Sequence, residues 1–100
     1  GYAMIGTAVV LHSTDGSIDA ARVAVIGAVD HATRLTGVED ALIGSPATHE
    51  SAINAAEYAL EGIEDHMVME DLQASAEYRE HLIGVYAKRA TIAAIDNLPK

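Results

Sequence analysis

The spacing of apolar residues changes once along this chain, at Val38, and this change is the strongest constraint on its fold. Residues 2–11 and 18–29 are rich in β-branched residues and contain no proline, which predicts two strands. Between them, Asp15 and Gly16 favour the positive φ angles of a tight hairpin. Residues 32–35 predict a short third strand. The first third of the chain is therefore expected to form a β-meander.

Alternation within the second strand places Val23 and Val25 on one face and the residues between and beside them on the other. The alternation is imperfect, as expected for a sheet that is partly covered on both faces. In the first strand, Gly6 is expected to mark a bulge, because a glycine inside a strand often does.

From Val38 onward the apolar residues recur at the three- to four-residue spacing of helices. Val38 and Leu42 predict a short helix, which Gly44 closes just after its C-cap. Thr48 is the expected N-cap of a second helix that ends near Gly62. The apolar stripe of this second helix is expected to comprise Ile53, Ala56 and Leu60.

Ser75 is expected to cap the last helix, which extends to about Ile95. Its predicted apolar stripe comprises Tyr78, Leu82, Val85 or Tyr86, Ala90 or Arg89, and Ala93, with Ile83, Ile92 and Ile95 on adjacent flanks. Because the strands come first and the helices follow, residues 1–100 are predicted to form a single α+β domain. In it, about three helices pack on one face of a small antiparallel three-stranded sheet.

Composition and charge exclude several classes of function. The net charge is −9, with six Lys and Arg against fifteen Asp and Glu, which argues against a nucleic-acid partner. The chain has no cysteine, so it can hold no disulfide, thiol nucleophile or iron–sulfur cluster of its own. No apolar run approaches the roughly 20 residues that span a membrane. These features agree with a cytoplasmic protein.

The residues that could carry chemistry do not form a recognisable catalytic or metal-binding pattern. Ser75 precedes an apolar run and has no histidine in a motif relation to it, which favours a helix cap over a nucleophile. Glu77, Glu80 and His81 miss the E-x-x-H spacing of a carboxylate-bridged metal site by one residue. We therefore predict no catalytic residue and no metal site.

Residues 71–79 read D-L-Q-A-S-A-E-Y-R, and this segment resembles the D-x-x-A-S-A-x-Y-R motif of a known family. The family is the C-terminal domain of the FAD-binding medium subunit of carbon monoxide dehydrogenases and related xanthine dehydrogenase-like molybdenum hydroxylases. Residues 38–44 resemble its V-E-x-x-L-x-G segment, and residues 88–90 its later R-A pair. The similarity covers nearly the whole chain in order. One departure is Ala32, where the family often has proline.

The resemblance implies a division of labour within a larger complex. Electrons would pass from a molybdenum-cofactor subunit through an iron–sulfur subunit to FAD, which is bound mainly by glycine-rich loops of the preceding domains. This chain contains no G-x-G-x-x-G sequence, so it is not expected to bind FAD alone. The start of the family's domain passes close to the flavin ring, which makes Tyr2 the expected contact with the flavin face.

The motif residues Asp71, Ser75, Tyr78 and Arg79 identify the family, and their expected roles are structural. Tyr78 is expected to pack on the buried face of the last helix, and Arg79 to pair with a nearby acid or carbonyl. The alternative role for Arg79 is an electrostatic one toward the flavin or a partner subunit.

A second interpretation belongs to another class of function. The composition permits independent folding, so the chain could be a stand-alone α+β module that oligomerises or binds a small ligand. The mass of the native gene product separates the two interpretations, because the medium subunit is about three times as long.

Overall fold

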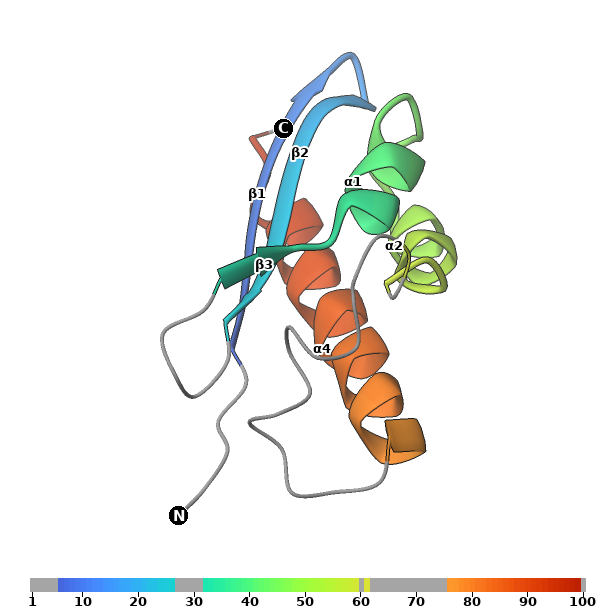
Figure 1. Ribbon diagram of the computed structural model, residues 1–100. Coiled ribbons are helices and arrows are strands. Elements are labelled where there is room, and N and C mark those ends of the chain that lie inside the picture. The colour runs from blue at the N-terminus through green and yellow to red at the C-terminus, as the bar shows by residue number, and fades with distance from the viewer. Residues whose placement is uncertain (1–5, 27–31, 60, 62–75, 100) are drawn as a thin grey trace.

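The computed structural model describes residues 6–26, 32–59, 61 and 76–99, with side chains from residue 81 onward in the last helix. Its strands are β1 (Gly6–Thr14), β2 (Ser17–Ile26) and β3 (Ala32–Arg34), which form an antiparallel sheet in the order β1-β2-β3 (Figure 1). The predicted meander is confirmed. The outer ends of the predicted strands, residues 2–5 and 27–29, lie outside the described residues.

The β1–β2 hairpin turns at Asp15 and Gly16, with φ angles of 54° and 81°. Both residues therefore adopt the left-handed conformation that a two-residue hairpin requires, as the Asp-Gly pair predicts. The bulge expected at Gly6 is wrong, because Gly6 pairs in regular register with Ile26. The register shifts instead beside His12, close to the turn, where an extra residue increases the local twist.

The described helices are α1 (Thr36–Leu42), α2 (His49–Ala56) and α4 (Ala76–Asp96), and they lie on one side of the sheet (Figure 1). Gly44, with φ +89°, follows the end of α1 as predicted. The Oγ1 of Thr48 accepts a hydrogen bond from the N–H of Ser51, which confirms the N-cap of α2. The helix itself ends at Ala56, earlier than Gly62. The predicted α+β architecture is confirmed.

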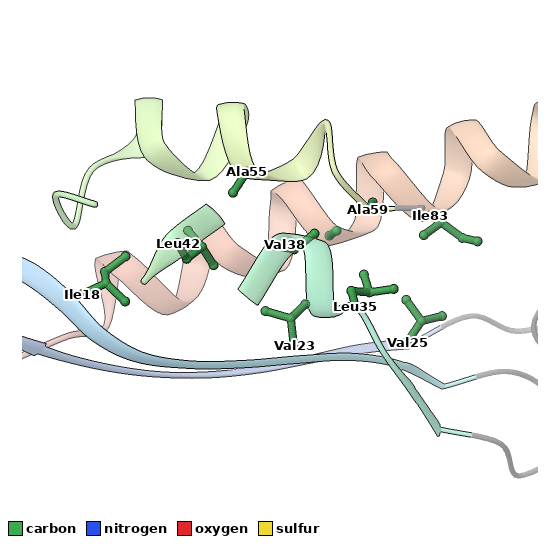
Figure 2. Packing of buried hydrophobic residues seen from close by; sticks show 10 residues of the cluster. Ile18, Val23, Val25, Leu35, Val38, Leu42, Ala55, Ala59 and Ile83 are labelled. Atoms are coloured by element: carbon green, nitrogen blue, oxygen red, sulfur yellow. The ribbon is translucent and has the colours of Figure 1, made fainter. Parts of the chain in front are cut away.

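The core lies between the sheet and the helices, and aliphatic side chains fill it (Figure 2). Val23 and Val25 enter it from β2, as the alternation predicts, while Arg22 and Ile26 are exposed on the other face. The complete cluster comprises Ile18, Val23, Val25, Leu35, Val38, Leu42, Ala55, Ala59, Ile83 and Ala87.

Two helix stripes differ from the prediction. In α2 and the turn after it, the buried side chains are Ala52, Ala55 and Ala59, whereas Ile53 is 47% exposed. In α4, the buried side chains are Ile83, Ala87, Thr91 and Ile95. The physical reason is close packing: α2 contacts both α1 and α4, and small side chains let the helix axes approach. Alanine positions can therefore take the core side while larger residues remain outside.

Candidate functional site

The residues singled out from the sequence fall mostly outside the described part of the chain. Tyr2, Asp71 and Ser75 lie there, so their roles stay predictions. Tyr78 and Arg79 belong to the first turn of α4, but their side chains are not described. The helix begins at Ala76, which is the residue directly after the predicted cap.

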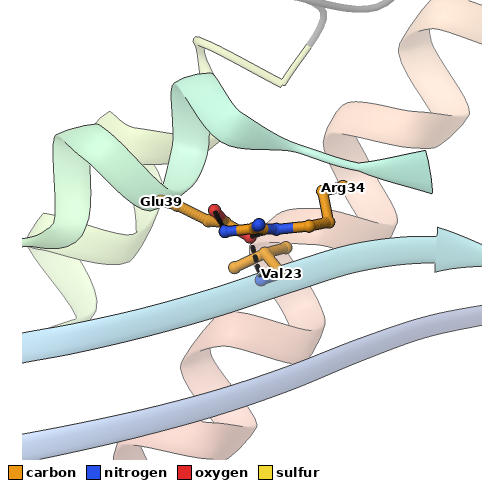
Figure 3. A network of polar contacts seen from close by, with 3 residues as sticks. All are labelled: Val23, Arg34 and Glu39. Atoms are coloured by element: carbon orange, nitrogen blue, oxygen red, sulfur yellow. Dashed lines mark hydrogen bonds and ion pairs between the residues drawn. The ribbon is translucent and has the colours of Figure 1, made fainter.

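The most ordered polar arrangement among the described residues surrounds the carboxylate of Glu39 (Figure 3). Its Oε2 accepts hydrogen bonds from the backbone N–H of Val23 at 2.9 Å and from Arg34 Nε at 3.1 Å. Its Oε1 accepts one from Arg34 Nη2 at 2.6 Å. The Glu39 side chain is 4% exposed and that of Arg34 is 57% exposed. The guanidinium therefore links a buried carboxylate to the protein surface in a bidentate pair.

The Glu39 side chain takes the place of a strand residue beyond the end of β3. Val23 accepts a hydrogen bond from the N–H of Leu35 at 2.8 Å, but its own N–H faces a position beyond the paired residues of β3. The carboxylate of Glu39 fills that position from α1. One side chain thus satisfies a buried backbone donor and ties β2, β3 and α1 together.

The carboxyl group of Glu39 stays ionised in the folded chain. Burial alone raises the pKa of this carboxyl group, but the hydrogen bonds from Arg34 and Val23 and the charges of Arg34 and Arg22 outweigh it. The net result is a pKa below the ordinary value. The same contact raises the pKa of Arg34. Both oxygens of Glu39 accept hydrogen bonds from fixed donors, so this carboxylate is suited to a structural role and not to proton transfer.

The pairing of Glu39 with Arg34 was not predicted from the sequence. A signal was present, because an acid stands between the buried positions Val38 and Leu42 of an apolar stripe. A buried acid requires a partner, and Arg34 is the basic residue that precedes α1 by two positions. The V-E-x-x-L-x-G resemblance therefore marks this ion pair.

Besides the Arg34–Glu39 pair, two contacts between a histidine and a carboxylate lie on the surface. His12 Nδ1 lies 2.6 Å from Asp19 Oδ1, and the hydroxyl of Thr14 donates to Asp19 Oδ2 at 2.7 Å. The Thr14 bond, then the His12 contact, lowers the pKa of Asp19. His49 Nε2 lies 2.6 Å from Asp96 Oδ1 and joins the start of α2 to the end of α4. Both histidines are exposed.

Shallow hollows, not an enclosed catalytic cleft, mark the described surface. A hollow of about 410 Å³ lies over β1 and β2 on the sheet face opposite the helices, between Val10, Ala20, Arg22 and Arg34. Another, of about 450 Å³, lies between α1 and α2. Within the ranges that the structure describes, no group of three or more His, Asp or Glu side chains could hold a metal ion. None of the described helices is long and apolar enough to cross a membrane.

Comparison with known proteins gives one consistent family. The CO dehydrogenase flavoprotein C-terminal domain family matches residues 1–94. The nicotine 6-hydroxylase medium subunit of Paenarthrobacter nicotinovorans is 36% identical over 93 residues, which is 93% of this chain and 32% of that protein.

Solved structures agree with this family and with the fold. Quinoline 2-oxidoreductase from Pseudomonas putida 86 superposes with a TM-score of 0.73 at 30% identity, over 92% of this chain and 31% of that one. Carbon monoxide dehydrogenase from Hydrogenophaga pseudoflava superposes with a TM-score of 0.71 at 33% identity, over 90% of this chain and 30% of that one. The chain thus spans about a third of the length of the relatives it matches.

Proposed function

The chain belongs to the CO dehydrogenase flavoprotein C-terminal domain family, and on this premise we propose that it completes the FAD-binding medium subunit of a molybdenum hydroxylase. The observation that carries the proposal is the match over residues 1–94, at the right size for one domain of a threefold longer subunit. In this role the domain helps to enclose the flavin and braces the subunit. It is not catalytic alone.

The described residues do not form a binding site for the phosphates of FAD. The two described glycines with positive φ, Gly16 and Gly44, serve the hairpin turn and the end of α1. Neither opens a helix with the backbone N–H groups that a pyrophosphate needs. We propose that the FAD phosphates are held by the preceding domains of the subunit and that Tyr2 is the contact of this chain with the flavin ring.

The bracing role follows from how the domain is held together. Glu39 fixes the position of β3 against β2 and α1 through three hydrogen bonds to buried or half-buried donors. The core cluster then joins the sheet to α1, α2 and α4. Such a rigid unit can hold one side of a cofactor site at a fixed distance, because the elements cannot shift independently.

The partners belong to the same proposal. They are the preceding FAD-binding domains, the molybdenum-cofactor subunit and the iron–sulfur subunit, and the complex is placed in the cytoplasm. Among the relatives, the carbon monoxide dehydrogenase is an enzyme with a molybdenum cofactor, although that structure lacks the Mo-pyranopterin moiety, and this supports the class of enzyme. Fractionation of cells that express the native gene product tests the location.

Reconstitution tests the proposed function. The full-length gene product, with the domains that precede this chain, should purify yellow with flavin absorbance, and the 100-residue chain alone should remain colourless. The control is the full-length product stripped of cofactor and reloaded with FAD. A well-folded full-length product that never takes up FAD would contradict the proposal. A native gene product of only about 10 kDa would favour the stand-alone module.

A further inference from the structure

The face of the sheet opposite the helices carries an apolar surface that no described helix covers (Figure 1). We call it the outer sheet face. Its apolar members are Ala8, Val10, Ala20, Ala24 and Ile26, and its polar members include His12, Arg22 and Arg34. Val10 is 70% exposed and Ile26 is 43% exposed, although both are β-branched residues in the middle or at the end of a strand. The remaining apolar members are alanines, so another surface can approach the sheet closely.

The outer sheet face is hollowed and carries positive charge in an acidic chain. The hollow of about 410 Å³ lies against Val10 and Ala20, with Arg22 and Arg34 at its border. Arg34 shares the face because it pairs with Ala24 across the sheet, and its charge is balanced by Glu39. Arg22 pairs with Val10 across the sheet, and no ion pair ties it within the described ranges. The chain as a whole has a net charge of −9.

This charge distribution argues against a second copy of the chain as the occupant. A second copy would present the same two guanidinium groups, Arg22 and Arg34, and the carboxylate of Asp19, beside His12 of β1, is already bonded to His12 and Thr14. The rest of the acidic chain offers no second apolar sheet surface among its described residues. The face instead fits a partner that presents apolar side chains with a carboxylate at the rim.

We propose that the outer sheet face is the surface on which the preceding, FAD-binding part of the same subunit docks. This inference rests on the proposed function. In the relatives this domain makes up about a third of the polypeptide, and as a C-terminal domain it is joined to the remainder through the segment that leads into β1. The first strand after that junction is therefore β1, an edge strand whose exposed residues Ala8 and Val10 belong to the outer sheet face.

Thiol labelling in the full-length subunit tests the docking surface. The chain has no cysteine, so Val10→Cys introduces a single thiol on the outer sheet face. We expect maleimide to label it at least about tenfold more slowly in the full-length subunit than in the 100-residue chain, because a packed interface excludes solvent. Mass spectrometry of the peptide that carries the thiol gives the rate. Ile43→Cys, at a residue that is 48% exposed on the helical side, is the control and should label equally in both.

The outcomes separate this inference from the function on which it rests. Equal labelling of Val10→Cys in an FAD-loaded subunit and in the isolated chain overturns the docking surface and leaves the function intact. Labelling that slows only when the other subunits assemble assigns the face to them and also overturns the inference. If the isolated chain has a doubled mass and its Val10→Cys thiol is labelled slowly, a second copy covers the face, and the inference is again overturned. Failure of the full-length product to bind FAD overturns the function itself.

Discussion

Replacement of Glu39 by glutamine tests the central structural argument most directly. The substitution keeps the size of the side chain but replaces one carboxylate oxygen by an NH₂ group. All three neighbours of the carboxylate are donors: the N–H of Val23 and two N–H groups of Arg34. One donor must then face another donor in a site that is 4% exposed. The Glu39→Gln variant is therefore expected to be clearly less stable than the parent.

The magnitude follows from the groups that lose their partners. An unsatisfied buried donor costs about 1–3 kcal/mol, and a hydrogen bond to a charged group contributes about 1.5–3 kcal/mol. The contribution of the hydrogen bonds from Arg34 is smaller here, because its side chain is more than half exposed and can bind water when it loses the carboxylate. We expect a loss of about 2–4 kcal/mol in the free energy of unfolding. For a domain of this size, that corresponds to a fall of about 10–25 °C in Tm.

Urea unfolding at neutral pH, followed by far-UV circular dichroism, measures this loss. The matched control is Asp40→Asn, which removes the neighbouring exposed carboxylate of the same helix and should change stability by less than about 0.5 kcal/mol. If Glu39→Gln unfolds within about 0.5 kcal/mol of the parent, the carboxylate does not complete the sheet in the manner inferred.

The difference between parent and variant should also depend on pH, with a defined sign. The pKa of Glu39 is lowered in the folded chain, so the unfolded state takes up a proton first as the pH falls. The stabilisation is then fully present above the ordinary value of 4.5 and is lost as the pH falls through the lower folded pKa. A difference that grows on acidification would contradict the lowered pKa.

Three further predictions concern other elements. Gly37→Ala should destabilise the chain by about 1–3 kcal/mol in urea unfolding, because the added Cβ would lie 2.5 Å from a backbone carbonyl of the turn after α2. Gly84→Ala, where a Cβ meets nothing within 4 Å inside α4, should instead stabilise it by about 0.5–1 kcal/mol. Thr14→Val should raise the pKa of Asp19 toward its ordinary value in an NMR titration, and an unchanged pKa would refute the hydrogen-bond explanation.

The sequence pattern did not predict which face of a helix is buried. The predicted stripe of α4 passed through Leu82 and Ala90, both half-buried, whereas Ile83 and Ala87 enter the core. The helix has apolar residues on several sides, so more than one stripe of the same period fits the sequence. Contact with both β1 and α2 selected among them. A periodic pattern fixes that a helix forms, but its rotation depends on the surfaces it meets.

The predicted site residues show a second limit. The family was correctly predicted, because residues 71–79 and 38–44 resemble family motifs that can be read from the sequence alone. The role of Glu39 could not be predicted in the same way. Its partners Val23 and Arg34 come from separate strands, and their distances depend on the register between β2 and β3.

By itself, the sequence determined the order of strands and helices, the hairpin at Asp15 and Gly16, the N-cap at Thr48 and the family. These depend on backbone preferences and short-range hydrogen bonds, which act between residues close in the chain. Only the tertiary structure decided that Glu39 is buried against Val23, that alanines face the core of α2, and that Val10 is left exposed. Each of these depends on which surfaces meet in space, and the free energy of that packing is shared among residues far apart in the chain.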